Sequence, residues 1–163
     1  MTTVLDDDVT IRGTLSPESI NMPQNAISAD AQIKAGTNIS ADKTQTRIYR
    51  THAQPNTAAT AETRAMFVAR KAGTVKEVLV GSIARATGDS TTTVNVLKNG
   101  TTILSSSVVL NNANTNRVGV AAAISSSALA IGDWLEVVIT ISAGTGTLPT
   151  GLFVQIEIDQ AGA

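Results

Sequence analysis

Two segments near the C-terminus have an aliphatic residue at every second position, and this pattern constrains the fold most. In residues 134–141 the alternate positions are aliphatic, namely Leu135, Val137, Ile139 and Ile141. Residues 152–159 repeat the pattern, with an aliphatic face made of Leu152, Val154, Ile156 and Ile158. Because successive side chains of a β-strand point to opposite faces, each segment predicts a strand in a sheet with one covered face.

A β-hairpin is predicted upstream, in the sequence VNVLKNGTTIL. Asn99-Gly100 suits the two positive φ angles of a type I′ turn, which joins antiparallel strands of matching twist. This turn places Val96 opposite Ile103.

Three further strands are predicted at residues 64–70, 75–83 and 118–124. Their predicted shared faces contain Met66 and Val68, then Val75, Leu79 and Ile83, and then Val118, Val120, Ala122 and Ile124. The other face of the third strand has only small residues, Gly119, Ala121 and Ala123, which suit contact with another element or another subunit. The stretch Ser125–Leu129 is a candidate for one short helical turn.

Closely spaced strands separated by turn-rich segments predict an all-β fold. About seven strands at this spacing are typical of a sandwich or barrel, and no strand–helix–strand alternation is present. Hydrophobic residues make up 42% of the 163 residues, but aromatic residues only 2%, so Ala, Val, Ile and Leu must supply the core. We predict an antiparallel β-sandwich, jelly-roll-like, over residues 53–163.

Residues 1–52 are predicted to form an extended N-terminal arm. Their apolar residues stand isolated among polar neighbours and cannot bury enough surface to offset the entropy of ordering. We expect the arm to gain order by docking on a neighbouring molecule. The candidate docking residues are Ile20, Met22, Ile27, Ile33 and Ile39.

Charge and composition exclude several classes of function. The net charge of −1 gives no basic field for nucleic acid or for an anionic membrane. The absence of cysteine excludes disulfides, thiolate metal sites and cysteine catalysis. The acidic N-terminus does not resemble a secretory signal, and no apolar run approaches the roughly 18 residues of a membrane span. We therefore expect a soluble protein without a membrane or nucleic-acid partner.

Candidate catalytic and ligand-binding residues are few. His52 is the only histidine, and a general base would need an orienting partner and a nearby nucleophile, so a loop histidine is the favoured interpretation. Asp6, Asp7 and Asp8 could supply oxygen ligands to calcium, but further ligands are not evident. The sequence AGTGT at 143–147 lacks the lysine of a phosphate-binding loop. We predict no enzyme activity, no cofactor and no metal site.

Two features suggest binding surfaces. Arg47, Arg50 and His52 form a modest basic cluster that, with Tyr49, could contact an acidic partner. The alternative is an ordinary solvated strand edge. Trp134 could serve as a platform for a sugar ring, although a role in the core or at the end of a barrel is the favoured interpretation.

Two parts of the chain resemble bacteriophage virion proteins. The runs VTIRGTLSPESINMPQNAIS and ADAQIKAGTNISADKTQTR resemble leader segments of tailed-phage virion proteins. The runs VLVGSIARATGDSTTTVNVLKNGTTILSSSVVL and SSSALAIGDWLEVVIT resemble jelly-roll-like domains of phage head decoration (cement) proteins and of some fibres.

The resemblance implies a homotrimer on the outer surface of the capsid. Its partners would be other copies of itself and the major capsid protein, whose neighbouring subunits it would clamp after assembly in the host cytoplasm. The alternative is a receptor- or glycan-binding domain of a head or tail fibre. The resemblance assigns no functional residue, because these patterns contain no catalytic or ligand motif.

Overall fold

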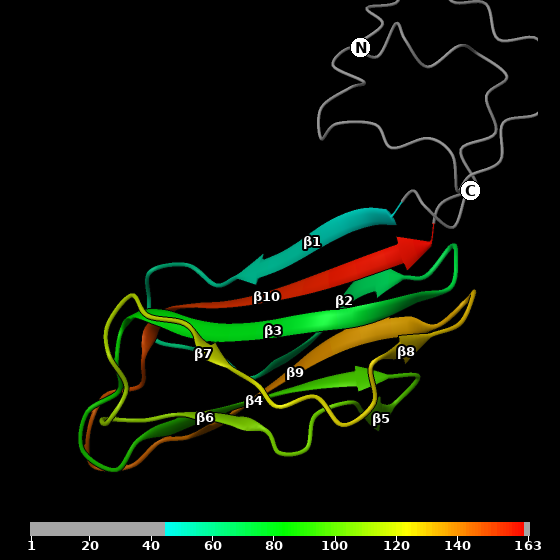
Figure 1. Cartoon of the computed structure of the whole chain (residues 1–163). Helices are drawn as coiled ribbons and strands as arrows, with labels where there is room; N and C mark the ends of the chain where they lie inside the picture. Colours follow the sequence, from blue (N-terminus) through cyan, green and yellow to red (C-terminus); the bar gives the residue numbers. More distant parts are fainter. Residues whose placement is uncertain (1–44, 162–163) are drawn as a thin grey trace, which may run out of the picture. The chain divides into compact units, whose positions relative to one another are not determined.

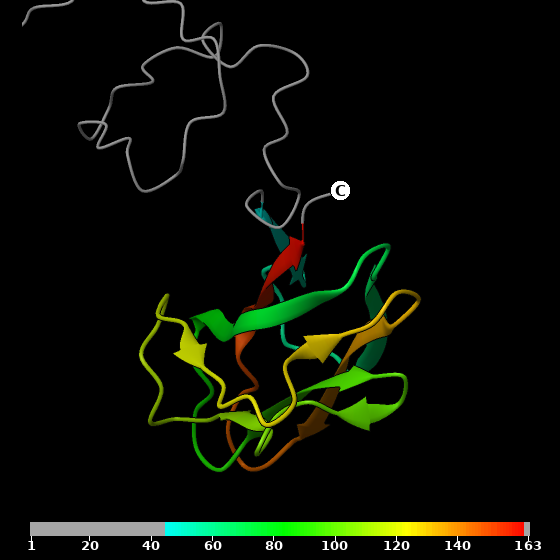
Figure 2. The same cartoon turned by 45° about the vertical axis from the view of Figure 1, so that its right-hand side comes forward.

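The computed structural model describes residues 45–161, which form two antiparallel β-sheets packed face to face (Figure 1 and Figure 2). Sheet A contains β1 (Gln45–Ala53), β3 (Gly73–Ala84), β7 (Val120–Ala121), β8 (Ala128–Leu129) and β10 (Thr150–Ala161). Sheet B contains β2 (Glu62–Val68), β4 (Thr91–Lys98), β5 (Thr101–Thr102), β6 (Val108–Leu110) and β9 (Trp134–Ser142). The predicted antiparallel β-sandwich is confirmed.

The order of strands places one long edge strand on each sheet. Sheet A has the order β1-β10-β3-β7, with β8 also paired to β3. Sheet B has the order β2-β9-β4-β5, with β6 also paired to β4. Within residues 45–161, β1 therefore pairs only with β10, and β2 only with β9.

The core between the sheets is aliphatic. The predicted inward residues of β9 and β10 are buried, namely Leu135, Val137, Ile139, Leu152, Val154, Ile156 and Ile158. Ile141, near the end of β9, is 40% exposed, so the predicted pattern fails at its last position. Burying one such side chain contributes about 1.5–3 kcal/mol, so a core without aromatic rings suffices here.

A β-bulge in β3 changes the predicted orientation of that strand. The register between β3 and β10 shifts at Lys76, so Val75 before the bulge and Val78 after it are both buried. Leu79 and Ile83 consequently lie on the outer face of sheet A. The prediction that Val75, Leu79 and Ile83 share a face is wrong, because the extra residue reverses the alternation.

A second bulge lies in β2, where the register with β9 shifts between Ala65 and Phe67. Met66 packs against the core, whereas Val68 pairs with Trp134 and is 48% exposed. The prediction that Met66 and Val68 share a face is therefore also wrong.

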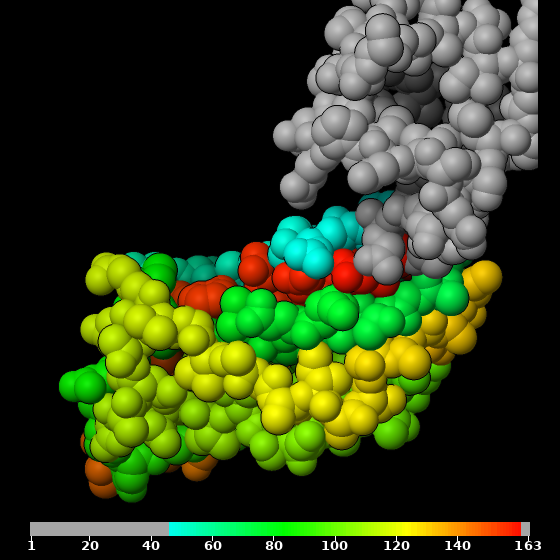
Figure 3. Space-filling model, viewed as in Figure 1, coloured from blue at the N-terminus to red at the C-terminus, as the bar shows by residue number. Residues whose placement is uncertain are grey.

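The segment after β7 crosses from sheet A to sheet B. The amide of Ala122 donates to the carbonyl of Val78 in sheet A at 2.9 Å, and the amide of Ser125 donates to Ile103 at 2.8 Å. The segment carrying β7 and β8, yellow in Figure 3, covers this side of the sandwich. A regular strand over residues 118–124 is incompatible with this crossing.

Two predictions for this region therefore need correction. Only Val120–Ala121 form a strand, and Val118 is 52% exposed, although Val120, Ala122 and Ile124 do pack against the core. The helical turn predicted for Ser125–Leu129 is wrong, because Ala128–Leu129 pair with β3 as β8.

The predicted hairpin is confirmed. Asn99 and Gly100 have φ angles of 50° and 81°. The amide of Ile103 donates to the carbonyl of Val96 at 3.0 Å, so these two buried residues lie opposite each other as expected.

The sandwich begins earlier than predicted. Residues 45–53 form β1 and pair with β10 along their whole length. The predicted boundary between residues 52 and 53 therefore assigns most of an edge strand of the sandwich to the arm. The inward positions of β1 include Arg50 and His52. Because both residues are polar, the sequence of β1 does not show the apolar–polar alternation that predicts a strand. The rest of the predicted arm, including Ile20, Met22, Ile27, Ile33 and Ile39, lies outside the described residues.

Candidate functional site

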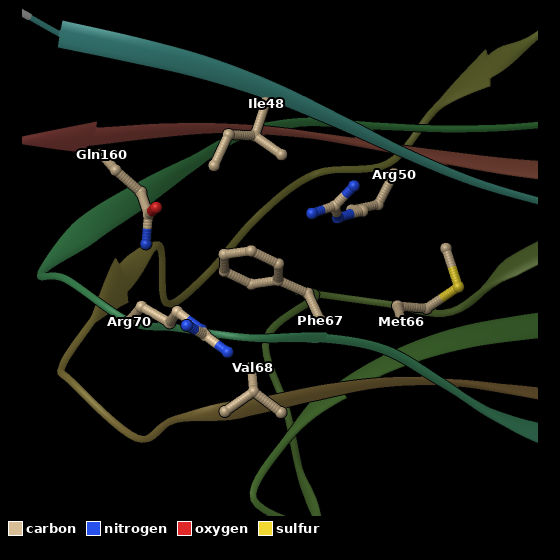
Figure 4. Close-up of a pocket in the computed structure, with 7 residues that line it drawn as sticks. All are labelled: Ile48, Arg50, Met66, Phe67, Val68, Arg70 and Gln160. Atoms are coloured by element: carbon tan, nitrogen blue, oxygen red, sulfur yellow. The ribbon is translucent and has the colours of Figure 1, made fainter.

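A groove separates the edge strands β1 and β2. It has a volume of about 400 Å³. It is lined by Ile48, Arg50, Met66, Phe67, Val68, Arg70 and Gln160 (Figure 4). We call it the β1–β2 groove.

The inward alternation of β1 builds one wall of the β1–β2 groove. Ile48 and Arg50 pair with buried Ile158 and Ile156, so both point between the sheets. The guanidinium carbon of Arg50 lies 5.5 Å from the centre of the Phe67 ring, within the range of a cation–π contact. This contact connects the walls that β1 and β2 provide.

Gln160 supplies a fixed polar group at the end of the groove. Its side-chain amide donates to the carbonyl of Lys71 at 3.0 Å, and the residue is buried. In Figure 4 Gln160 and Arg50 lie on the β1–β10 side of the Phe67 ring, and Arg70 lies on the β2 side.

The β1–β2 groove is electropositive. Neither Arg50 nor Arg70 forms an ion pair or a side-chain hydrogen bond with any other residue of 45–161. The remaining lining is apolar except for Gln160. A ligand that suits this lining carries carboxylates next to aliphatic side chains.

A polar network closes one end of the groove. Glu62 at the start of β2 accepts from the side-chain amide of Gln54 at 2.5 Å and from Nε of Arg64 at 2.7 Å. Nε2 of His52 lies 2.8 Å from the same carboxylate. The hydrogen bond from Gln54, followed by those from Arg64 and His52, lowers the pKa of Glu62 to about 2. His52 therefore belongs to a strand and to this network, and its prediction as a loop residue is wrong.

The predicted basic cluster is divided between two faces. Arg50 points into the groove, but Arg47 and Tyr49 lie on the outer face of sheet A. Nε of Arg47 lies 3.1 Å from carboxylate oxygens of both Asp159 and Glu157. The hydrogen bond to Asp159 is the main cause of a raised pKa for Arg47. Arg47 is thus already paired within its own sheet.

The small residues predicted as an interface are exposed. Gly119, Ala121 and Ala123 have exposed positions beside sheet A. A side chain added at Gly119 would contact Leu79 and Phe153, which belong to the outer face of the same sheet. These residues remain available for the predicted contact with another subunit.

The glycine-rich stretch 143–147 has a structural role. The amide and hydroxyl of Thr145 donate to the carboxylate of Asp89, and the amide of Thr147 donates to the hydroxyl of Thr87 at 2.8 Å. The bonds from Thr145 lower the pKa of Asp89. A Cβ at Gly146 would overlap the carbonyl oxygen of Thr87, so glycine permits this close approach.

The side chains of residues 45–161 do not form a metal site. No group of three His, Cys, Asp or Glu side chains in residues 45–161 could hold a metal ion. Asp6, Asp7 and Asp8, considered as calcium ligands, lie outside that range.

The outer face of sheet B is nearly free of charge, which the sequence pattern did not predict. Glu136 is the one charged residue at its outward positions in β2, β9, β4, β5 and β6. The others are Thr63, Ala65, Val68, Trp134, Val138, Thr140, Ser142, Thr91, Thr93, Asn95, Leu97, Thr102 and Val109. We call this surface the sheet B face.

Trp134 belongs to the sheet B face. It is 45% exposed beside Val68 at the start of β9, so it does not lie in the core. Sheet A differs, because its outward positions include Arg47, Glu77, Glu157 and Asp159.

No helix within residues 45–161 has the length and apolar character needed to cross a membrane. Comparison of the chain with protein-family models and with curated proteins gives no match.

Proposed function

We propose that this protein is a non-enzymatic structural component of a virion. It would decorate the outer surface of a bacteriophage capsid as a homotrimer and clamp neighbouring subunits of the major capsid protein. The sheet B face is the observation that carries the proposal. Burying a surface with one charged residue requires little desolvation of ions, so a flat, threonine-rich sheet can pack on protein at low cost.

A closed trimer needs two different surfaces on each subunit. A three-fold arrangement joins one patch of a subunit to another patch of the next, because the contact is heterologous. The sheet B face is the first patch. The second is the part of sheet A where Leu79 and Phe153 lie beside Gly119, and where Leu79 pairs with Ala121. Small side chains there let the neighbouring sheet approach closely.

The order of the strands supports a jelly-roll-like interpretation. The chain passes from one sheet to the other six times, between β1 and β2, β2 and β3, β3 and β4, β6 and β7, β8 and β9, and β9 and β10. Jelly rolls with two such sheets are common in virion and lectin domains. The resemblance to phage decoration proteins supports the first of these two classes.

In this proposal the N-terminal arm attaches the trimer to the capsid. Ile20, Met22, Ile27, Ile33 and Ile39 would insert into successive pockets of the major capsid protein. Three arms on one trimer make weak individual contacts effectively permanent through multivalency.

The mass of the purified protein in solution tests the trimer. We expect three copies per particle for the native chain, and a monomer for Thr140→Lys and for Ala121→Lys, because each places a charge in one of the two patches. Thr57→Lys is the matched control, since Thr57 lies exposed in the loop between β1 and β2 and should leave the mass unchanged. A native chain that is monomeric at all concentrations would contradict the proposal.

Binding to undecorated capsids tests the attachment. Saturable binding by the native chain is expected, together with weaker binding of Ile33→Asp/Ile39→Asp at unchanged trimer mass. Retention of full capsid binding by this variant would assign the attachment to another part of the chain.

The second candidate is a receptor- or glycan-binding fibre domain, and the exposure of Trp134 favours it. Its ring could stack on a sugar. This candidate predicts that the native chain binds host cell envelopes and that Trp134→Ala abolishes the binding. Decoration predicts little envelope binding by either chain.

A further inference from the structure

We propose that Asn99, in the turn between β4 and β5, is a site of self-modification. Its side-chain amide is lost through a cyclic imide formed with Gly100, and contacts with Asp133 and Trp134 restrain this reaction in the folded protein. Asn99-Gly100 is the one Asn-Gly pair of the 163 residues. The proposal does not depend on the trimer, because it rests on contacts within one chain.

The reaction needs only water as a co-reactant. The main-chain nitrogen of Gly100 attacks Cγ of Asn99, so the N–Cγ bond forms and the Cγ–Nδ2 bond breaks. Nδ2 leaves as ammonia together with the proton that the main-chain nitrogen loses. Water then adds to either carbonyl of the ring and leaves an aspartate or an isoaspartate at position 99. Either product has one more negative charge than asparagine.

The turn leaves room for this chemistry. Asn99 and Gly100 are both exposed. A side chain on the residue after an asparagine hinders the approach to its main-chain nitrogen, and glycine has none. A Cβ at Gly100 would have no atom within 4 Å, so no packing contact holds the glycine in place.

Three hydrogen bonds hold Asn99 in the folded protein. Its Oδ1 accepts from the amide of Trp134 at 2.9 Å, and its Nδ2 donates to Oδ1 of Asp133 at 2.8 Å. Its own amide donates to the carbonyl of Trp134 at 2.9 Å. Ring closure requires the side chain to fold back onto its own main chain, whereas both of its polar atoms are held by another turn. The reaction therefore proceeds from molecules in which this contact has opened locally, and its rate follows their population.

The product is incompatible with the same contact. Hydrogen bonds from the amide of Ala130 and from Asn99 lower the pKa of Asp133, so this carboxylate is charged at neutral pH. A carboxylate at position 99 replaces a donor by a second negative charge, and the two groups repel. Nζ of Lys98, 3.8 Å from Asp133, offsets this repulsion only in part. Modification therefore detaches the hairpin turn from the start of β9, where Trp134 lies on the sheet B face.

The rate of conversion of Asn99 in the full-length protein tests the restraint. Peptide mass spectrometry at mildly alkaline pH follows the conversion in the folded chain and in concentrated urea. We expect the folded chain to react about ten-fold more slowly, because opening the contact breaks exposed hydrogen bonds. Asp133→Ala should accelerate the reaction of the folded chain about five-fold and leave the rate in urea unchanged. Asp89→Ala is the matched control, since Asp89 holds a turn at the other end of β4 through Thr145.

Asn99→Asp supplies the aspartate product directly. It should lower the midpoint of urea unfolding more at pH 7 than at pH 2, where protonation of the carboxylates reduces their repulsion. Asn112→Asp, at an exposed position after β6, is the control and should not show this difference.

Each measurement has a result that overturns part of the proposal. A chain that does not convert at Asn99 in urea would remove the site. Equal rates in the folded and unfolded chains would remove the restraint, and so would a faster reaction in the folded chain, which would show that the Trp134 amide promotes the attack. An Asn99→Asp midpoint equal to that of the native chain at pH 7 would remove the effect on the turn.

Discussion

At the scale of the residue, Glu62 connects the two sheets through its contact with His52 of β1. It accepts hydrogen bonds from Gln54 and from Arg64 and contacts His52. These partners favour the charged carboxylate and lower its pKa from 4.5 to about 2. The stabilisation is therefore fully present above pH 4.5 and is lost as the pH falls through about 2.

We predict that Glu62→Gln lowers the free energy of unfolding by about 1 kcal/mol at pH 7, because a hydrogen-bonded carboxylate is replaced by a neutral amide. At pH 2 the difference from the native chain should be small. Urea unfolding of the native chain and of Glu62→Gln at pH 7 and at pH 2 measures the difference in the free energy of unfolding at each pH. Glu77→Gln is the control, since Glu77 is exposed and has no ion pair within residues 45–161. A loss of equal size at both pH values would contradict the assigned cause.

At the scale of the element, the sequence predicts the inner strands better than the edges. The alternation in β10 extends from Leu152 to Ile158 without error, because this strand has neighbours on both sides and one face on the core. In β1 the inward positions Arg50 and His52 are polar, because an edge strand covers the core only in part. The bulges at Lys76 and Met66 were not predictable, since each depends on the register of a partner strand.

The prediction at the scale of the element concerns the stability of the Asn99-Gly100 hairpin turn. Gly100 has a φ of 81°, and a Cβ there would meet no atom within 4 Å, so the cost of Gly100→Ala is backbone strain alone. We predict a loss of about 1 kcal/mol. Gly100→Asn should cost less, because asparagine tolerates a positive φ better than alanine does. Thermal unfolding of the two variants measures the difference, and an equally stable Gly100→Ala protein would show that the turn has changed type.

At the scale of the whole molecule, the two sheets share one core. Trp134 is the only tryptophan and lies on sheet B, so its fluorescence reports on that sheet. Ile156 is fully buried in sheet A.

We predict that Ile156→Ala destabilises the protein by about 2–5 kcal/mol through the cavity it leaves. Because the core is continuous, urea transitions followed by Trp134 fluorescence and by circular dichroism should coincide and shift together. A fluorescence transition that stays in place while the circular dichroism shifts would mean that sheet B unfolds separately.

The candidate surfaces emerge only at this scale. The β1–β2 groove combines Arg50, Phe67 and Gln160 from three strands, and no local spacing predicts that they meet. The sheet B face was equally hidden in the sequence, because threonine and valine also occur in strands of sheet A such as β3. The sequence selects Arg50 only as a member of a basic cluster with Arg47, and the structure separates the two residues onto different faces.

The pairing of β1 has a mechanical consequence for a protein held by its N-terminal residues. Gln45 pairs with Ala161, so tension arriving from residue 44 acts at the first of the nine residue pairs that join β1 to β10. Such a load would peel the strand away pair by pair, as a zipper opens, instead of shearing all pairs at once. Arg47, held by Asp159 and Glu157, is the first ionic contact that the opening front meets. Resistance to pulling would then depend on the pairs of one edge strand, opened one after another, whereas the aliphatic interior sets resistance to heat.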